Sequence, residues 1–166
     1  LWGDVDSYLE DLFLAEDTAL SETLRVSDEE GLDPIAVTPT QGKLLNLLVQ
    51  MHQSKRVLEL GVLGGYSTIC MARGLPADGQ LVTLELVEHN ANVARRNIDA
   101  AGVGEKVEIR VGEALDSLKA MVAAGEAPFD FVFMDANKDG YPEYFEQIMK
   151  LARKGTVIIA DNVIRN

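Results

Sequence analysis

The sequence contains 166 residues, 47% of them hydrophobic, and this length fits one domain that needs neither a disulfide nor a structural metal to fold. Fifteen Lys and Arg residues stand against 27 Asp and Glu residues, which gives a formal net charge of −12. Because nucleic-acid binding depends on neutralising phosphates with Lys and Arg, this balance argues against a polynucleotide partner. The single cysteine, Cys70, excludes an internal disulfide and a cysteine-based zinc site.

The sequence shows no targeting or membrane segment. No apolar run reaches the ~18 residues that a membrane span requires, and no basic stretch followed by an apolar one forms a signal peptide. We therefore expect a cytoplasmic setting without a membrane partner. The sequence starts at Leu1 without a methionine, which suggests a trimmed chain.

Acidic residues are concentrated at the start of the chain. Residues 1–33 contain eleven acidic residues and a single basic one, Arg25, whereas residues 34–166 are nearly neutral. A solvated helical face explains this pattern, and a lid or a partner surface is the alternative. Helical spacing of apolar residues predicts helices over 4–17 and 18–30. Thr38 is expected to cap a third helix that begins at Pro39. The expected buried stripe of that helix consists of Leu44, Leu45, Leu48 and Met51.

From residue 55 onward, short β-rich runs alternate with helical stretches. Strands are predicted at 56–60, 81–85, 107–111, 129–134 and 156–160. Helices are predicted between them at 66–73, 88–101, 113–124 and 141–153. These helices should stop near Gly74, Gly102, Gly125 and Gly155. Strands that are apolar on both faces and separated by helices predict a doubly wound α/β fold with a mainly parallel, Rossmann-like sheet. We expect one domain over 1–166, in which 1–37 form an acidic helical segment and 38–166 form the α/β core.

Ligands of such sheets bind beyond the carboxyl ends of the strands, so the residues after each strand are informative. The first strand leads into the glycine-rich segment Gly61–Ser67, whose spacing is neither that of a dinucleotide-binding loop nor that of a Walker loop. The helix that follows offers free N–H groups to an anionic group. Glu85 follows the second strand and can accept hydrogen bonds from ribose hydroxyls, and Gly112–Ala114 follow the third. Together these segments predict a nucleoside pocket.

The fourth and fifth strands end in polar residues. Asp135 and Lys138 follow the fourth strand, and Asp161 and Asn162 follow the fifth. If these strands are neighbours, they lie about 4.8 Å apart, which brings two carboxylates and one amide oxygen together. Such oxygen ligands suit Mg²⁺ or another hard divalent cation. Ordinary loop capping by Asp and Asn is the structural alternative.

These motifs resemble those of the cation-dependent O-methyltransferases, which include catechol and caffeoyl-CoA O-methyltransferases and many small bacterial relatives. The resemblance runs from about Thr38 to the last residue. It is carried by Val57–Gly61 with Gly65–Ser67, by Glu85, by Asp135–Lys138 and by Asp161–Asn162. Most S-adenosylmethionine-dependent enzymes share the glycine-rich loop, whereas the Asp and Lys pair combined with Asp-Asn is more specific to this class.

The resemblance implies a role for each of these residues. Ser67 would lie near the carboxylate of S-adenosylmethionine, Glu85 would bind the ribose, and Gly112–Ala114 would flank the adenine. The implied cofactor-binding set is Glu59, Gly61, Gly65, Tyr66, Ser67, Glu85, Gly112, Glu113, Ala114 and Asp135. Asp135, Asp161 and Asn162 would bind a divalent cation, and Lys138 would act as the general base.

The implied chemistry is consistent with these roles. A phenol with a pKa of ~10 is mostly protonated at neutral pH, and a cation bound to its oxygen lowers that pKa. Lys138, beside a metal and a sulfonium, should have a lowered pKa and can accept the proton. A second, adjacent hydroxyl would complete chelation, so we expect a small hydroxylated aromatic substrate of the catechol type.

Members of the family continue past the fifth strand into an antiparallel pair, whereas this sequence stops at Asn166. We therefore expect the antiparallel strands to be missing and 156–160 to form an edge strand. An apolar stripe on the N-terminal helices and the unpaired last strand together predict a homodimer. Two other functions remain open: an RNA-modifying methyltransferase, which the net charge disfavours, and a non-catalytic S-adenosylmethionine-binding domain.

Overall fold

The computed structural model describes residues 2–164, and its centre is a five-stranded sheet in which every neighbouring pair of strands is parallel. The strand order is β3-β2-β1-β4-β5. The strands are β1 (Arg56–Leu60), β2 (Gln80–Glu85), β3 (Val107–Val111), β4 (Phe129–Met134) and β5 (Ala152–Ala160). The predicted doubly wound fold is therefore confirmed, and no antiparallel strand follows β5 within the described residues.

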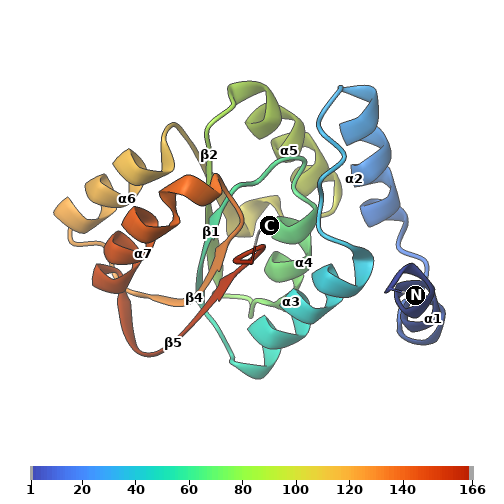
Figure 1. Cartoon of the computed structure of the whole chain (residues 1–166), viewed down its shortest axis with the longest axis horizontal. Helices are drawn as coiled ribbons and strands as arrows, with labels where there is room; N and C mark the ends of the chain where they lie inside the picture. The colour runs from blue at the N-terminus through green and yellow to red at the C-terminus, as the bar shows by residue number, and fades with distance from the viewer. Residues whose placement is uncertain (1, 165–166) are drawn as a thin grey trace.

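Helices cover both faces of this sheet (Figure 1). The α-helices are α1 (Trp2–Phe13), α2 (Thr18–Glu29), α3 (Pro39–Met51), α4 (Tyr66–Gly74), α5 (Glu88–Ala100), α6 (Ala114–Ala123) and α7 (Tyr141–Lys150). Helices α6 and α7 lie on one side, and α3, α4 and α5 lie on the other (Figure 1). Helix α1 packs on α3, and α2 packs on α4 and α5, so both form an outer layer. No helix within residues 2–164 is long and apolar enough to cross a membrane.

Alternating side chains of the strands divide the interior into two apolar cores. In β1, Val57 joins the core beneath α3, α4 and α5, while Leu58 joins the core beneath α6 and α7. Phe131 and Val132 divide in the same way along β4. Because side chains of a strand alternate between its faces, this pattern produces the continuous apolar runs seen in the sequence.

The predicted start of α3 is confirmed by a capping box. The Oγ1 atom of Thr38 accepts a hydrogen bond from the backbone N–H of Gln41 at 3.3 Å. The side chain of Gln41 in turn accepts one from the backbone N–H of Thr38 at 2.8 Å. Both donors are among those that a helix N-terminus leaves without a partner, so the pair stabilises this end of α3.

The predicted buried stripe of α3 is wrong in part. Leu44 and Met51 are 55% and 79% exposed, and the residues that face the core are Gly42, Leu45 and Val49. A Cβ atom at Gly42 would come within 2.9 Å of side chains on α4, so the glycine allows the two helices to pack closely. Helix α3 therefore makes its closest contact with α4 at Gly42 and leaves the predicted stripe of Leu44 and Met51 exposed.

Three predicted boundaries also change. The first helix ends at Phe13, because Asp17 serves as the N-cap of α2 and accepts a hydrogen bond from the backbone N–H of Leu20 at 3.1 Å. Helix α7 ends at Lys150, and β5 starts at Ala152, four residues before the predicted strand. Gly155 does not end a helix but lies within β5 with a φ of 98°, where the register between β4 and β5 shifts.

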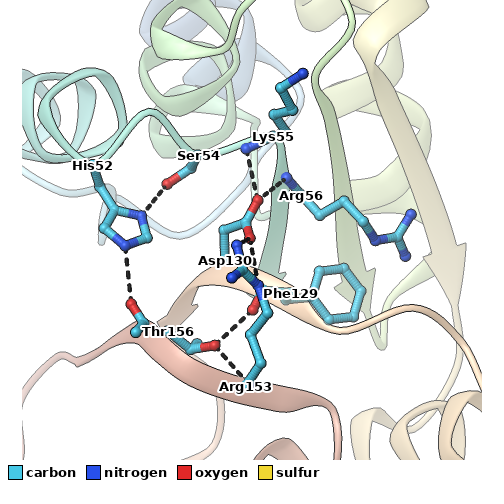
Figure 2. Close-up of polar contacts among 9 residues, drawn as sticks. His52, Ser54, Lys55, Arg56, Phe129, Asp130, Arg153 and Thr156 are labelled. Atoms are coloured by element: carbon cyan, nitrogen blue, oxygen red, sulfur yellow. Dashed lines mark hydrogen bonds and ion pairs between the residues drawn. The ribbon is translucent and has the colours of Figure 1, made fainter.

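A polar cluster at the amino-terminal end of the sheet joins β5 to β4 and β1 (Figure 2). The Oδ2 atom of Asp130 accepts hydrogen bonds from the backbone N–H groups of Lys55 and Arg56, at 2.8 and 3.0 Å. Its Oδ1 atom accepts from the guanidinium of Arg153 at 2.5 Å. The hydroxyl of Thr156 accepts from the backbone N–H of Arg153 at 2.9 Å. Asp130 thus links three segments at the end of the sheet opposite to the predicted site.

Candidate functional site

Four predicted site residues form a row across the carboxyl-terminal edge of the sheet. The register aligns β2, β1, β4 and β5 so that these residues occupy equivalent positions on neighbouring strands. In order across the sheet they are Glu85, Gly61, Asp135 and Asp161. A cleft of about 850 Å³ opens over this row. Its size falls within the range of about 300–1,000 Å³ that is typical of cofactor and small-molecule sites.

Most of the predicted site residues line this cleft. They are Gly61, Tyr66, Ser67, Glu85, Glu113, Ala114, Asp135, Lys138, Asp161 and Asn162. Three others, Glu59, Gly65 and Gly112, are not part of its lining. The side chain of Glu59 is fully buried, Gly65 is the N-cap of α4, and Gly112 donates its N–H to the carbonyl of Glu85. These three therefore support the cleft from behind.

The glycine-rich turn between β1 and α4 requires glycine for two reasons. Gly61 and Gly65 have φ values of 96° and 91°, a region that side chains disfavour. A Cβ atom at Gly61 would also lie 2.3 Å from the backbone oxygen of Asp135. The side chain of Asn97 on α5 donates a hydrogen bond to the carbonyl of Gly64 at 2.9 Å. These constraints hold the turn in place and leave the N-terminus of α4 at the cleft.

Glu85 lines the cleft and also holds the turn. Its Oε2 atom accepts hydrogen bonds from the backbone N–H groups of Val62 and Leu63, each at 3.1 Å. Its Oε1 atom accepts one from the N–H of Val87 at 2.9 Å. A carboxylate has about four acceptor positions, so capacity remains for a ligand hydroxyl.

Asp135 and Asp161 are positioned by the backbone of the neighbouring strands. The N–H of Asp135 donates to the carbonyl of Leu60 at 2.9 Å, and the N–H of Asp161 donates to that of Met134 at 3.0 Å. Asn162 follows with a φ of 52° and donates its N–H to Oδ1 of Asp161 at 2.9 Å. Two carboxylates and an amide fit a hard divalent cation that takes further oxygen ligands from water or substrate. Residues 2–164 contain no cluster of three or more His, Cys, Asp or Glu side chains arranged for a metal.

Lys138 pairs with Asp135 beside this row. Its Nζ atom donates to Oδ1 of Asp135 at 2.5 Å and to the hydroxyl of Tyr141 at 2.8 Å. Burial disfavours the ammonium, but these hydrogen bonds outweigh burial and leave the pKa of Lys138 raised. This direction is opposite to the lowered pKa expected from the sequence. The physical reason is that the charge of Asp135 acts on Lys138 directly, whereas a shared cation would weaken that attraction.

Comparison with known proteins identifies the family. A family model described as O-methyltransferase matches residues 11–166. The chain belongs to the O-methyltransferase family. It is therefore an O-methyltransferase with the Rossmann-like fold of the S-adenosylmethionine-dependent methyltransferases, as the motifs predicted.

Several relatives are similar over nearly the whole chain. A protein named catechol O-methyltransferase from Niastella koreensis is 49% identical over 100% of this chain and 75% of its own length. One of the same name from Mycobacterium tuberculosis is 47% identical over 98% of this chain and 72% of its own length. The crystal structure of an O-methyltransferase from Bacillus cereus in complex with SAH has a TM-score of 0.95 and 49% identity, covering 98% of this chain and 74% of that one.

Sequence reasoning missed two parts of the site. Helix α2 and the segment 32–39 form one wall of the cleft, so part of the acidic N-terminal segment contributes to the site. The gap between the helix predicted over 18–30 and the one predicted from Pro39 indicated a connecting segment but not where that segment would lie. Asn97 was also missed, because an asparagine within an amphipathic helix gives no signal of the buried contact that it makes.

Proposed function

We propose that this chain transfers the methyl group of S-adenosylmethionine to a hydroxyl of a small catechol-like substrate, with the help of a divalent cation. The observation that carries this proposal is the row of Glu85, Gly61, Asp135 and Asp161 at one cleft. The names of the two catechol O-methyltransferases support the substrate class, and SAH, the demethylated product of the cofactor, in the related crystal structure supports the cofactor.

The cofactor would occupy the part of the cleft formed by β1, β2 and α4. S-Adenosylmethionine, when bound, supplies a methyl group on a cationic sulfur. The N-terminus of α4, including the backbone N–H of Ser67, would hold its carboxylate, because helix N-termini bind anions. Glu85 would accept a hydrogen bond from a ribose hydroxyl at its remaining acceptor position, and Glu113 with Ala114 would flank the adenine.

The acceptor would lie over the ends of β4 and β5. A divalent cation, when bound, supplies positive charge that favours the ionised form of a phenol. Asp135, Asp161 and Asn162 would hold it, since all three line this part of the cleft. Lys138 would take the hydroxyl proton at Nζ once the cation shares the charge of Asp135. A substrate with two adjacent hydroxyls fits a cation that has only three protein ligands.

A methyl-transfer assay on catechol, with and without a chelator, tests this proposal. Lys138→Ala should lower kcat by the ~10²–10⁴-fold typical of a general base, while Lys154→Ala, an exposed lysine on β5, serves as the matched control. Asp161→Ala should abolish transfer yet leave S-adenosylmethionine binding by calorimetry nearly unchanged. Full activity in chelator, or in Lys138→Ala, would show that the mechanism is wrong. Cofactor binding without any transfer would instead support a non-catalytic domain.

We also propose that the chain forms a homodimer through the outer face of α1 and α3. On α1, Tyr8 and Phe13 are 63% and 68% exposed, and on the adjacent α3, Leu44 and Met51 are exposed as well. A second copy of this chain would cover these apolar side chains. Sedimentation of the wild type and of Phe13→Glu tests this, since a monomeric wild type at micromolar concentration would refute it.

A further inference from the structure

Tyr141, the first residue of α7, contacts Lys138 from outside the cleft. Its hydroxyl oxygen lies 2.8 Å from Nζ of Lys138, 2.7 Å from the carbonyl oxygen of Met134 and 3.2 Å from that of Asp161. Lys138 lines the cleft, whereas Tyr141 does not. Met134 ends β4, and Asp161 directly follows β5. The hydroxyl therefore joins the lysine to the ends of the two strands that lead into the proposed cation ligands.

The two carbonyl oxygens fix the direction of the hydrogen bond to Lys138. A phenol hydroxyl has a single hydrogen, and a carbonyl oxygen can only accept one. The hydrogen of Tyr141 therefore points to the carbonyls, of which that of Met134 is the nearer at 2.7 Å. Only lone pairs remain for Nζ, so Lys138 is the donor in this contact. A nitrogen that donates to Tyr141 turns any lone pair of its own away from the tyrosine, which leaves that lone pair available to a ligand in the cleft.

Within residues 2–164, the other hydrogen-bond partner of Lys138 belongs to the proposed cation site. Nζ of Lys138 donates to Oδ1 of Asp135 at 2.5 Å. A cation bound by Asp135 would compete for the lone pairs of this carboxylate, but it would not compete for the hydroxyl of Tyr141. Because a lysine side chain is long and has many rotamers, Nζ needs a lasting contact to stay in one position. The short turn Lys138–Gly140 supplies that contact, since it places Tyr141 three residues after Lys138 and on the same side.

We propose that Tyr141 is a positioning residue, which holds Nζ of Lys138 in the cleft while Asp135 binds the cation. This inference rests on the proposed function, in which Lys138 takes the proton of the acceptor hydroxyl. That proton moves from the substrate oxygen to Nζ, and Tyr141 keeps its own proton because it points to the carbonyl of Met134. Tyr141 touches neither substrate nor cofactor, since it does not line the cleft. It therefore affects the rate of transfer and not the binding of either ligand.

A double-mutant cycle on kcat tests whether Tyr141 acts through Lys138. Tyr141→Phe removes the hydroxyl and keeps the ring. It should lower kcat for catechol roughly tenfold, the size of one hydrogen bond to a charged group, and leave KM and the dissociation constant of S-adenosylmethionine unchanged. In Lys138→Ala, the added Tyr141→Phe should lower kcat no further. Tyr144→Phe is the matched control, because it removes a hydroxyl of the same helix that is not bonded to Lys138, so any effect of it should be equal in both backgrounds.

A second cycle follows urea unfolding of the same variants without any ligand. Tyr141→Phe should lower the urea midpoint of the wild type more than that of Lys138→Ala, because only the wild type has this hydrogen bond to lose. An equal fall of the midpoint in both backgrounds, or an equal fall of kcat, would overturn the inference. A wild type that transfers no methyl group would instead overturn the proposed function, and the urea cycle alone would then decide whether Tyr141 holds Lys138.

Discussion

Replacing Asp130 by alanine should destabilise the fold from the end opposite to the cleft. The carboxylate accepts two backbone N–H groups from the start of β1 and the guanidinium of Arg153 (Figure 2). A buried donor left without a partner costs about 1–3 kcal/mol, and because both of these hydrogen bonds are only partly buried, each should cost about 1 kcal/mol. The side chain of Arg153 is 56% exposed, which limits its ion pair to at most about 1 kcal/mol. We expect Asp130→Ala to lower the free energy of unfolding by about 3 kcal/mol.

The comparison with Asp130→Asn identifies which contact of Asp130 accounts for the loss of stability. Both backbone N–H groups are bound by one oxygen, Oδ2, which an amide oxygen can replace. Asparagine should therefore lose only the ion pair, at a cost of about 1 kcal/mol. Urea unfolding followed by circular dichroism measures both variants. Asp78→Ala is the control, because it removes an exposed ion pair to Lys55. The reasoning is refuted if Asp130→Asn costs as much as Asp130→Ala, or if neither variant is destabilised.

The same residue predicts a dependence on pH. Burial raises the pKa of Asp130, but hydrogen bonds from backbone N–H groups and from Arg153 outweigh burial, so that its pKa lies below the usual range. A lowered pKa in the folded state contributes stability above the unfolded-state pKa of about 3.9 and loses it as the pH falls through the folded value. The stability of the wild type should thus decline more steeply in acid than that of Asp130→Asn.

Further predictions concern single positions. Gly61→Ala places a side chain at a positive φ and puts its Cβ atom 2.3 Å from the backbone oxygen of Asp135, so it should lower both the melting temperature and the affinity for the cofactor. Gly102→Ala is the control, because this glycine also has a positive φ but has open space around it. It should lower the free energy of unfolding only by the backbone strain of about 1 kcal/mol. Thr38→Ala removes the cap of α3 and should lower the free energy of unfolding by about 1 kcal/mol, measured in urea. Burial raises the pKa of Cys70 to about 12, so thiol reagents should label it only after denaturation, and rapid labelling of the native protein would contradict this.

Local patterns in the sequence were sufficient to predict the parallel sheet and the residues that gather at its carboxyl-terminal edge. The predicted limits of β1 and β4 agree with the structure, because runs apolar on both faces can be buried only in a covered parallel sheet. The limits of β3 agree as well, although this edge strand alternates apolar residues with Glu108 and Arg110. Since the carboxyl ends of parallel strands share one edge, the order of motifs along the chain was enough to bring Glu85, Gly61, Asp135 and Asp161 to one cleft. The roles of these residues in binding and catalysis stay predictions.

Tertiary packing decided the features for which the sequence offered equivalent choices. Two stripes of α3 have helical spacing, and the close contact of Gly42 with α4 selects which one is buried. The start of β5 depends on its pairing with β4 around Asp130. Local sequence propensity cannot predict this start, because the two paired segments are distant in sequence. Glu59 and Lys138 were both recognised as polar residues near strand ends. Only the folded chain buries the carboxylate of Glu59 behind Ser67 and pairs Lys138 with Asp135, because burial and charge depend on neighbours distant in sequence.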